Sequence, residues 1–300
     1  MQKPVNTDTK NYDYVENFAV NKNTGEIINT VTIVAPSGSR VETPEQRWQN
    51  KRGQGIAQSR KLRVTANKEL GKFFFVHNKT DFNDISPAAL TRLIFLNTYL
   101  DYKNNQLMLR RDTPMHRKDL IKVLGIPKAT MSRFWNEVNP KYIRETDNGL
   151  IFTNNDFFIR GYLNKSQKTD NAMYRKFFVT GIRKLYKSTS ISNHKHLGYI
   201  FQLLPYINIE YNIVCHNPLE QDYTKINPMT LQEFCSIIGY SMNNIGRLLC
   251  TYKHIRFDGD RAFCKFVNDG IDRNNSEIFI NPHVLYGGSD YKKVEVLGIF

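Results

Sequence analysis

The sequence contains no long apolar run. No stretch of about 18 apolar residues occurs in it, so we expect no segment that spans a membrane. Its first 20 residues lack the apolar core of a secretory signal, and we therefore expect a cytoplasmic protein. Cysteine is scarce: Cys215, Cys235, Cys250 and Cys264 lie far apart, without a Cys-x-x-Cys pair. This spacing favours reduced core residues over disulfides or a zinc site.

The signatures of common enzymes are also missing. There is no Gly-x4-Gly-Lys-Ser/Thr phosphate loop, no Gly-x-Gly-x-x-Gly after a strand and no paired carboxylate constellation. His194-Lys195-His196 invites comparison with the paired metal-binding histidines of rolling-circle nicking enzymes. Lysine, however, stands where that pattern needs an apolar strand residue, and the surrounding sequence predicts the start of a helix. We therefore expect no enzyme, and no catalytic residue, metal or cofactor.

Positive charge, by contrast, is abundant. The chain of 300 residues carries 42 Lys and Arg against 28 Asp and Glu, a net charge of +14, with a pI of about 9.5. Such an excess favours a polyanionic partner, although a basic protein without one is the alternative. The segment Arg47–Lys72 is rich in cations and contains Trp48. Two readings stay open for it: a flexible arm that follows a phosphate backbone, or a solvated, partly disordered leader.

Short sequence pairs recur in the same order in the two halves of the chain. The offset grows from 104 (176 − 72) to 127 (278 − 151), which indicates loop insertions in the second copy, Asn217–Asn227 among them. The pattern predicts a duplicated domain. The matches include Lys72–Val76 with Lys176–Val179, Ile94-Phe95 with Ile200-Phe201, Pro114-Met115 with Pro228-Met229, Arg133 with Arg247, and Ile151-Phe152 with Ile278-Phe279.

In each copy, the sequence predicts two short helices that are joined by a glycine turn and followed by a hairpin. In the first copy, Arg117–Leu124 and Lys128–Val138 are amphipathic and flank Gly125-Ile126-Pro127; a turn at Asp147-Asn148-Gly149 follows. We expect Met131, Phe134, Trp135 and Val138 to face inward. The second copy repeats the order with Leu231–Ile238, Met242–Tyr252, Arg261–Val267 and Glu277–Ile280. A helix-turn-helix followed by a hairpin is a winged helix.

The predicted fold is therefore of the α+β class, with two tandem winged helix-turn-helix domains and a basic N-terminal extension. We expect a small hairpin around Asn23-Thr24-Gly25 in the extension, and a basic amphipathic helix over Met173–Tyr186 in the linker. The predicted boundaries are 1–71 for the extension, 72–163 for the first domain, 164–190 for a partly helical linker and 191–300 for the second domain.

In a helix-turn-helix the second helix enters the major groove, and its first residues lie nearest the base edges. Arg133 is expected to bind guanine and Asn136 adenine, whereas Thr130 and Ser132 suit phosphate contacts. The wings provide further cations. The complete expected DNA-binding set is Lys128, Thr130, Ser132, Arg133, Asn136 and Arg144 in the first copy, and Ser241, Asn243, Asn244, Arg247, Arg256, Arg261 and Lys265 in the second.

The end of the second copy resembles a known family. Ile278–Gly288, which contains Ile280-Asn281-Pro282, is similar to the closing segment of RepL-type replication proteins of Firmicute plasmids and phages. The first copy keeps Asn154 and Gly161 but lacks the proline. The resemblance implies a winged helix that binds repeated origin sequences, helps to open the duplex and recruits host replication proteins.

The sequence thus predicts a sequence-specific double-stranded DNA-binding protein of a plasmid or phage, acting as a replication initiator at origin repeats. A transcriptional repressor or activator that uses the same winged helices is the first alternative. The second is a protein-interaction module that contacts a polymerase or helicase. Host replication or transcription proteins are the expected protein partners, no membrane partner is expected, and the chain is expected to act as a monomer or homodimer.

Overall fold

The computed structural model describes residues 12–15, 18–29, 44–78, 82–163, 174–257, 259–267 and 276–296. The chain divides into two compact units, Met1–Lys61 and Leu62–Phe300, and the second contains both predicted DNA-binding domains. Helices and antiparallel strands are mixed in the described residues, as the α+β class predicts. No helix in these ranges is long and apolar enough to cross a membrane.

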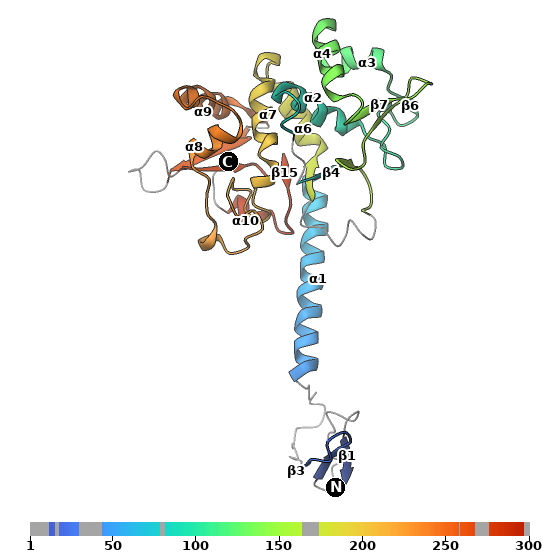
Figure 1. Cartoon of the computed structure of the whole chain (residues 1–300), viewed down its shortest axis with the longest axis vertical. Coiled ribbons are helices and arrows are strands. Elements are labelled where there is room, and N and C mark those ends of the chain that lie inside the picture. The colour runs from blue at the N-terminus through green and yellow to red at the C-terminus, as the bar shows by residue number, and fades with distance from the viewer. Residues whose placement is uncertain are drawn as a thin grey trace. The chain divides into compact units, whose positions relative to one another are not determined.

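The first unit contains a small three-stranded antiparallel sheet in the order β1-β2-β3 (Figure 1). Its second hairpin turns at Asn23-Thr24-Gly25, where the sequence predicts it, and Gly25 has a φ of 71°. Helix α1 begins in this unit and is 27 residues long, so the segment expected to be a flexible arm or a partly disordered leader is helical. The bounds are Tyr12–Val15 for β1, Phe18–Asn21 for β2, Ile27–Asn29 for β3 and Pro44–Leu70 for α1.

A four-stranded antiparallel sheet in the order β15-β10-β4-β9 forms the centre of the second unit. The expected helix over Met173–Tyr186 is wrong in its first part, because Tyr174–Phe178 is strand β10, paired on both sides. Only the following α6 is helical, and both elements contribute buried residues to the core instead of forming a linker. The bounds are Phe73–His77 for β4, Phe158–Ile159 for β9, Val179–Ser188 for α6 and Leu285–Tyr286 for β15.

The pairing of this sheet is two-fold symmetric. Strand β9 pairs with β4 through Phe75 and Ile159, and β15 pairs with β10 through Lys176 and Tyr286. Phe75 and Lys176 are themselves partners in the central pair, so exchanging the halves maps the sheet onto itself. The structural offset of the strands is therefore 101 (176 − 75). The sequence match of Lys72–Val76 with Lys176–Val179 is wrong by three residues.

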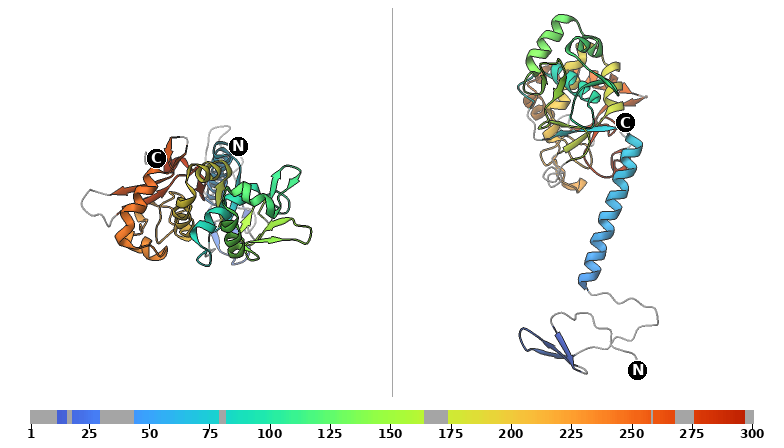
Figure 2. Two further views of the ribbon diagram at one scale, coloured as in Figure 1. Left: turned by 90° about the horizontal axis from the view of Figure 1, so that it is seen from above. Right: turned by 90° about the vertical axis from the view of Figure 1, so that its right-hand side faces the viewer.

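Helices α2 (Pro87–Leu96) and α7 (His194–Gln202) pack against each other across the same two-fold relation. Viewed from above, the elements of the first half, in green, and those of the second, in orange, lie on opposite sides of this pair (Figure 2). The crossing is close: the Thr91 hydroxyl donates to the carbonyl of His194, and a Cβ on Gly198 would meet the carbonyl of Pro87. Ser86 caps α2, and Pro87 is its first residue.

Each half continues with two short helices and a hairpin, close to the predicted bounds. Met131, Phe134, Trp135 and Val138 are buried, as expected. The second half differs by a 3-10 turn, η6, before its second helix. The bounds are Arg117–Leu124 (α3), Lys128–Val138 (α4), Ile143–Glu145 (β7) and Ile151–Thr153 (β8), and then Leu231–Ile237 (α8), Met242–Asn244 (η6), Ile245–His254 (α9), Phe263–Val267 (β13) and Ser276–Ile280 (β14).

Buried asparagines bind the edge strand of each half, β9 or β15, in the same way. Asn105 and Asn212 have φ angles of 56° and 54°, a region that asparagine tolerates better than most residues. Asn105 donates to the carbonyl of Phe158, and Asn212 donates to that of Leu285. The acceptors differ by 127 residues (285 − 158), the offset that Asn154 and Asn281 also show (281 − 154). The same local structure therefore occurs twice.

The remaining elements are short and connect these parts. They are Asn97–Tyr99 (η1), Met108–Arg110 (β5), Thr113–Pro114 (β6), Ile191–Asn193 (η3), Leu204–Tyr206 (η4), Tyr223–Lys225 (η5), Arg256–Phe257 (β11), Asp260–Arg261 (β12) and Lys292–Glu295 (α10).

Candidate nucleic-acid interface

Helix α3 is capped at both of its ends, the second of which opens the turn to α4. Asp119 accepts a hydrogen bond from the His116 backbone at the start of α3, which satisfies one of the free donors there. Gly125 ends α3 with a φ of 64°, a left-handed conformation that glycine adopts without strain. The Arg117 guanidinium lies 4.8 Å from the ring centre of the buried Trp135, which ties α3 to α4. The outer face of α4 is therefore held in a defined orientation.

That outer face carries most of the side chains predicted to contact DNA. Lys128, Arg133 and Asn136 are exposed, and so is Ser132, whose hydroxyl donates to the Lys128 carbonyl. Thr130 is only partly exposed, at the border of the buried face. Arg133 makes no hydrogen bond or ion pair within the described part of the chain. Its guanidinium is thus available to an external acceptor.

The second helix pair has the same construction. Thr230 and Glu233 form a reciprocal cap at the start of α8, and Gly239 ends the α8 segment with a φ of 62°. Ser241, which precedes η6, and Asn243 and Asn244 within it are exposed. Arg247 is exposed on α9, eight residues after the left-handed glycine (247 − 239), as Arg133 is after Gly125 (133 − 125). The two arginines therefore occupy equivalent positions.

A hollow of about 530 Å³, lined mainly by polar residue types, lies beside Arg247. Arg247 and His254 of α9 line it together with Ser188, the last residue of α6, and with Ser190 and Asn193, which follow that helix. This combination of a guanidinium, an imidazole and hydroxyl groups suits an anion such as a phosphate. Cys250 of α9 also lines this hollow, and its side chain is exposed. The expectation that all four cysteines are core residues is therefore wrong at Cys250. Cys215 and Cys235 are buried, and the side chain of Cys264 lies outside the described residues.

The hairpin residues predicted to contact DNA are less uniform. Arg144 and Arg261 are exposed, whereas Arg256, also exposed, donates to the Gly259 carbonyl. Lys265 lies in β13, but its side chain is outside the described residues, as is the whole turn 268–275. Lys141, at the base of the first hairpin, is held by Asp84 at 2.7 Å instead of being open to a ligand.

Tyr142 binds the same carboxylate, with its hydroxyl 2.5 Å from Asp84. Burial, and then this hydrogen bond, raise the pKa of Tyr142 to about 12. The tyrosine therefore stays protonated at neutral pH, so it keeps donating to Asp84 and anchors the base of the first hairpin.

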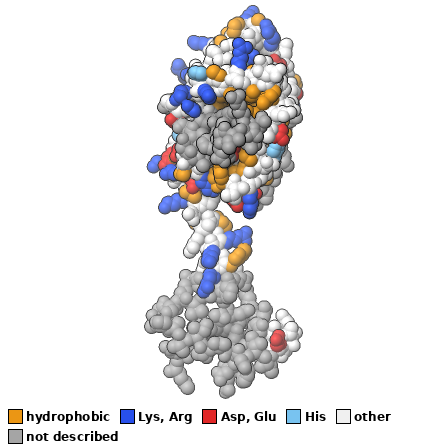
Figure 3. Space-filling view, turned by 90° about the vertical axis from the view of Figure 1, so that its left-hand side faces the viewer, with side chains coloured by type: hydrophobic (Ala, Val, Ile, Leu, Met, Phe, Trp, Pro, Cys, Tyr) orange, Lys and Arg blue, Asp and Glu red, His pale blue; other side chains and the backbone are white. Residues whose placement is uncertain are grey.

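The excess of positive charge is unevenly distributed. Residues 44–72 carry eight Lys and Arg against two acidic residues, and residues 174–202 carry six against none. Residues 203–300 carry nine against eleven, so this part of the chain has no positive excess of its own. On the face drawn in Figure 3, Lys and Arg side chains gather over the upper part of the Leu62–Phe300 unit. On α1, Trp48 is 59% exposed, and Arg52 lies 5.3 Å from its ring centre.

His194 and His196 are buried, which is typical of histidines with a structural role. His194 begins α7, as the sequence predicts, and its ring lies 4.2 Å from that of Tyr186. Burial is the largest of the effects that lower the pKa of His194 and of His196. Among the described residues, no group of three or more His, Cys, Asp and Glu side chains is placed to hold a metal ion.

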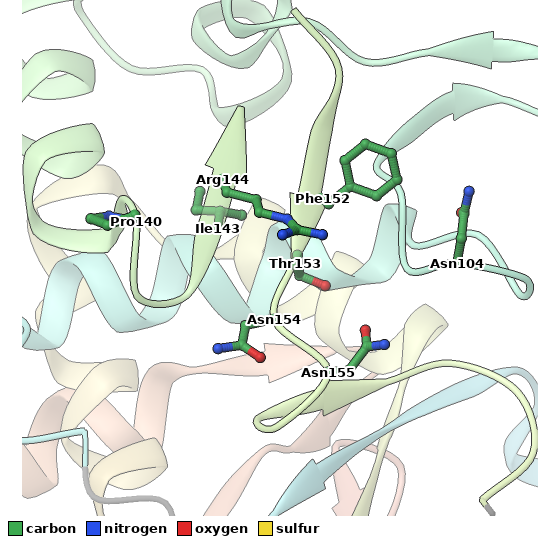
Figure 4. A pocket seen from close by; sticks show the side chains of 8 residues that line it. All are labelled: Asn104, Pro140, Ile143, Arg144, Phe152, Thr153, Asn154 and Asn155. Carbon is green, nitrogen blue, oxygen red and sulfur yellow. The ribbon is translucent and has the colours of Figure 1, made fainter. Parts of the chain in front are cut away.

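Sequence reasoning did not anticipate a polar hollow of about 330 Å³ around Arg144 (Figure 4). Asn104, Asn155 and Thr153 line it together with Asn154. The doublets Asn104-Asn105 and Asn154-Asn155 are a sequence signal that could have indicated it, because each combines one exposed asparagine with a buried or partly buried one.

No protein-family model, no curated protein and no solved structure matches this chain.

Proposed function

We propose that the protein is a sequence-specific double-stranded DNA-binding protein built from two winged helix-turn-helix domains, with α4 and α9 as its recognition helices. The observation that carries this proposal is the equivalence of Arg133 and Arg247. Each is exposed on the second helix of a pair, at the same distance from a left-handed glycine. Arginine at such a position can donate two hydrogen bonds to guanine.

The packing of the helices suggests how the two elements would meet one duplex. Helix α4 packs on α2, α2 on α7, and α7 on α9, so the four helices form a continuous row. Packed helices lie 8–10 Å apart, so the row spans at most about 24–30 Å between α4 and α9. Successive major grooves on one side of B-DNA are about 34 Å apart. A slightly bent duplex would bring two successive grooves to the two helices.

The two-fold relation of the halves adds a constraint on the DNA site. Because exchanging the halves reverses the direction of each element, the half-sites read by α4 and α9 should be inverted relative to each other. Their centres should be about one helical turn, roughly 10 base pairs, apart. One chain would then bind a pair of inverted half-sites, which simple helix-turn-helix proteins bind as dimers. The covalent linkage of the two recognition helices would raise the affinity.

The test is selection of binding sites from a random duplex pool at near-physiological salt, followed by affinity measurements on the selected and a scrambled duplex. We expect a preference on the order of 10³-fold or more and two inverted half-sites. Arg133→Ala should weaken binding to the selected site by about 1–3 kcal/mol and relax the preference at one base position. Arg247→Ala should do the same in the other half-site.

The matched control is Lys292→Ala, which removes an exposed cation from α10. It should leave the preference unchanged. Equal losses on all duplexes for the two arginine variants would identify phosphate contacts instead of base contacts. An absence of any preference, with binding that vanishes as salt rises, would refute the proposal and favour the interaction-module alternative.

The biological role follows from what the bound DNA does. As the RepL-type resemblance implies, we propose replication initiation at origin repeats of a plasmid or phage. An initiator should bind arrays of sites and make nearby A·T-rich DNA reactive to permanganate, which oxidises unpaired thymines. A transcriptional regulator should occupy a single operator and leave the duplex closed.

A further inference from the structure

The hairpin β7–β8 of the first half leaves one face open. Arg144 and Phe152 are direct cross-strand partners, so their side chains lie on the same face of the hairpin. Between them and the loop residue Asn104 lies the hollow of about 330 Å³, within the size range of small-molecule sites. Figure 4 shows the guanidinium of Arg144 reaching across it toward β8, with Pro140 on one side and Asn104 on the other.

An unpartnered hydroxyl lies at the floor of this hollow. Thr153 is 4% exposed, and its Oγ1 has no hydrogen-bond partner within the described part of the chain. Figure 4 shows this oxygen turned toward the centre of the hollow. A buried polar atom without a partner is costly, and most such atoms in folded proteins are satisfied by protein, water or a ligand. The position is therefore suited to a polar group that comes from outside.

Two of the asparagines that line the hollow use their side-chain oxygens as acceptors within the protein. Asn104 accepts with Oδ1 from the Gln106 backbone, and Asn155 accepts with Oδ1 from Asn105. Their Nδ2 groups make no hydrogen bond within the described ranges. With the guanidinium of Arg144, the hollow offers several donors beside an aromatic face. A ligand that fits is planar and rich in acceptors.

The second half shows that the fold does not require this opening. The residue equivalent to Phe152 is Phe279 (279 − 152 = 127), which is 1% exposed and packed with Ile213 and Cys215. Tyr211 and Ile226 cover that cluster, and Ile226 lies in the insertion Asn217–Asn227. At the position of Thr153 the second half has Ile280, an apolar residue. One copy thus closes the face with hydrophobic side chains, while the other keeps it open and polar.

We propose that the hollow beside β7–β8 binds one unpaired nucleobase of a DNA single strand. The base would stack on Phe152, the amides and the Thr153 hydroxyl would contact its acceptor edge, and Arg144 would hold a phosphate or a base carbonyl. Thymine and guanine present carbonyl acceptors, whereas cytosine and adenine place an amino donor at the same edge. This inference rests on the proposed DNA binding and adds a single-strand site to it, which an initiator needs once the duplex has opened.

The test compares binding of the full chain to fluorescent (dT)12, to (dC)12 and to the selected duplex in the same buffer. We expect (dT)12 to bind more tightly than (dC)12. Phe152→Leu should reduce the affinity for (dT)12 by roughly 5- to 150-fold, the range that corresponds to one lost aromatic stack. Its affinity for the duplex should change less than two-fold.

Two further variants make the result independent of folding defects at Phe152. Thr153→Val keeps the side-chain shape and removes only the hydroxyl, and Asn155→Ala removes one amide donor. Both should reduce the preference for (dT)12 over (dC)12. The control Lys292→Gln removes an exposed cation from α10, outside the predicted DNA-binding set, and should leave that preference unchanged.

The failures are distinguishable. If the wild-type chain binds the duplex selectively but not (dT)12, or if the three variants bind (dT)12 as the wild type does, the single-strand site is wrong and the proposed function stands. If each variant weakens duplex and single-strand binding equally, the hollow is a general phosphate contact and the base site is wrong. If the chain binds neither form selectively, both proposals fail.

Discussion

Among the glycines that the structure describes, Gly198 leaves the least space for a side chain, at the point where α7 crosses α2. A Cβ built on Gly198 would lie 1.8 Å from the carbonyl oxygen of Pro87 and 2.3 Å from its carbon. Both atoms belong to the backbone, so no side-chain rotation can relieve the clash. Gly198→Ala therefore forces the two helices apart by about 1.5 Å before ordinary contact distances return.

The magnitude follows from two opposing terms. Forcing extra volume into a packed interior costs typically about 1–3 kcal/mol, and a displaced helix pair belongs at the upper end. Replacing glycine by alanine inside a helix contributes about 1 kcal/mol in the other direction. We expect a net loss of about 2 kcal/mol in the free energy of unfolding. For a unit of this size the midpoint of thermal unfolding should fall by roughly 4–8 °C.

Circular dichroism at 222 nm during heating, together with urea titration, measures this loss. Gly246→Ala is the matched control, because Gly246 lies in α9 and a Cβ added there would have no neighbouring atom within 4 Å. That variant should gain up to about 1 kcal/mol from helix propensity. If Gly198→Ala proves as stable as Gly246→Ala, the close crossing of α2 and α7 is wrong, and so is the row of helices on which the half-site spacing depends.

Three further predictions address the asparagine, the buried histidine and the exposed thiol. Asn212→Ala should cost about 3–5 kcal/mol in urea unfolding, because it strands two buried carbonyls and puts alanine in a left-handed conformation; a loss below 1 kcal/mol would contradict this. Burial lowers the pKa of His194 below its usual 6.5, so the folded state favours the neutral imidazole. The free energy of unfolding should therefore be highest above pH 6.5 and should fall as the pH drops below it. In unfolding curves at pH 5–7, His194→Gln should make this fall smaller. In a Cys264→Ser background, a maleimide should label Cys250 alone, and the selected duplex should slow the reaction; unchanged labelling would place α9 away from DNA.

Where the local sequence carries its own signals, its predictions agree with the structure. The observed bounds of α3 and α4 equal the predicted ones, because Gly125 stops the first helix and Pro127 precedes the second. The turn at Asn148-Gly149 likewise gives the β7–β8 hairpin. Each of these features depends on residues within one or two turns of each other.

Strand β10 shows where that local reasoning fails. Its sequence Tyr-Arg-Lys-Phe-Phe does not alternate between polar and apolar residues and also fits an amphipathic helix. It is a strand because β4 and β15 pair with it on both sides. The hollow beside Arg144 was missed for a related reason. It exists because the first half lacks the insertion whose Ile226 covers the corresponding face of the second half, and no residue near Arg144 encodes that absence.

The sequence by itself determined the helix pairs, their caps, the hairpin turns and the exposed arginines, since short-range sterics and the apolar period specify them. The tertiary structure alone decided that the two halves share one sheet and one helix crossing. That arrangement depends on pairing between strands about 100 residues apart and on the small residues Thr91 and Gly198 meeting across a two-fold relation. Such contacts become visible only when both partners are in place, because neither helix nor strand carries a local signal for its distant neighbour.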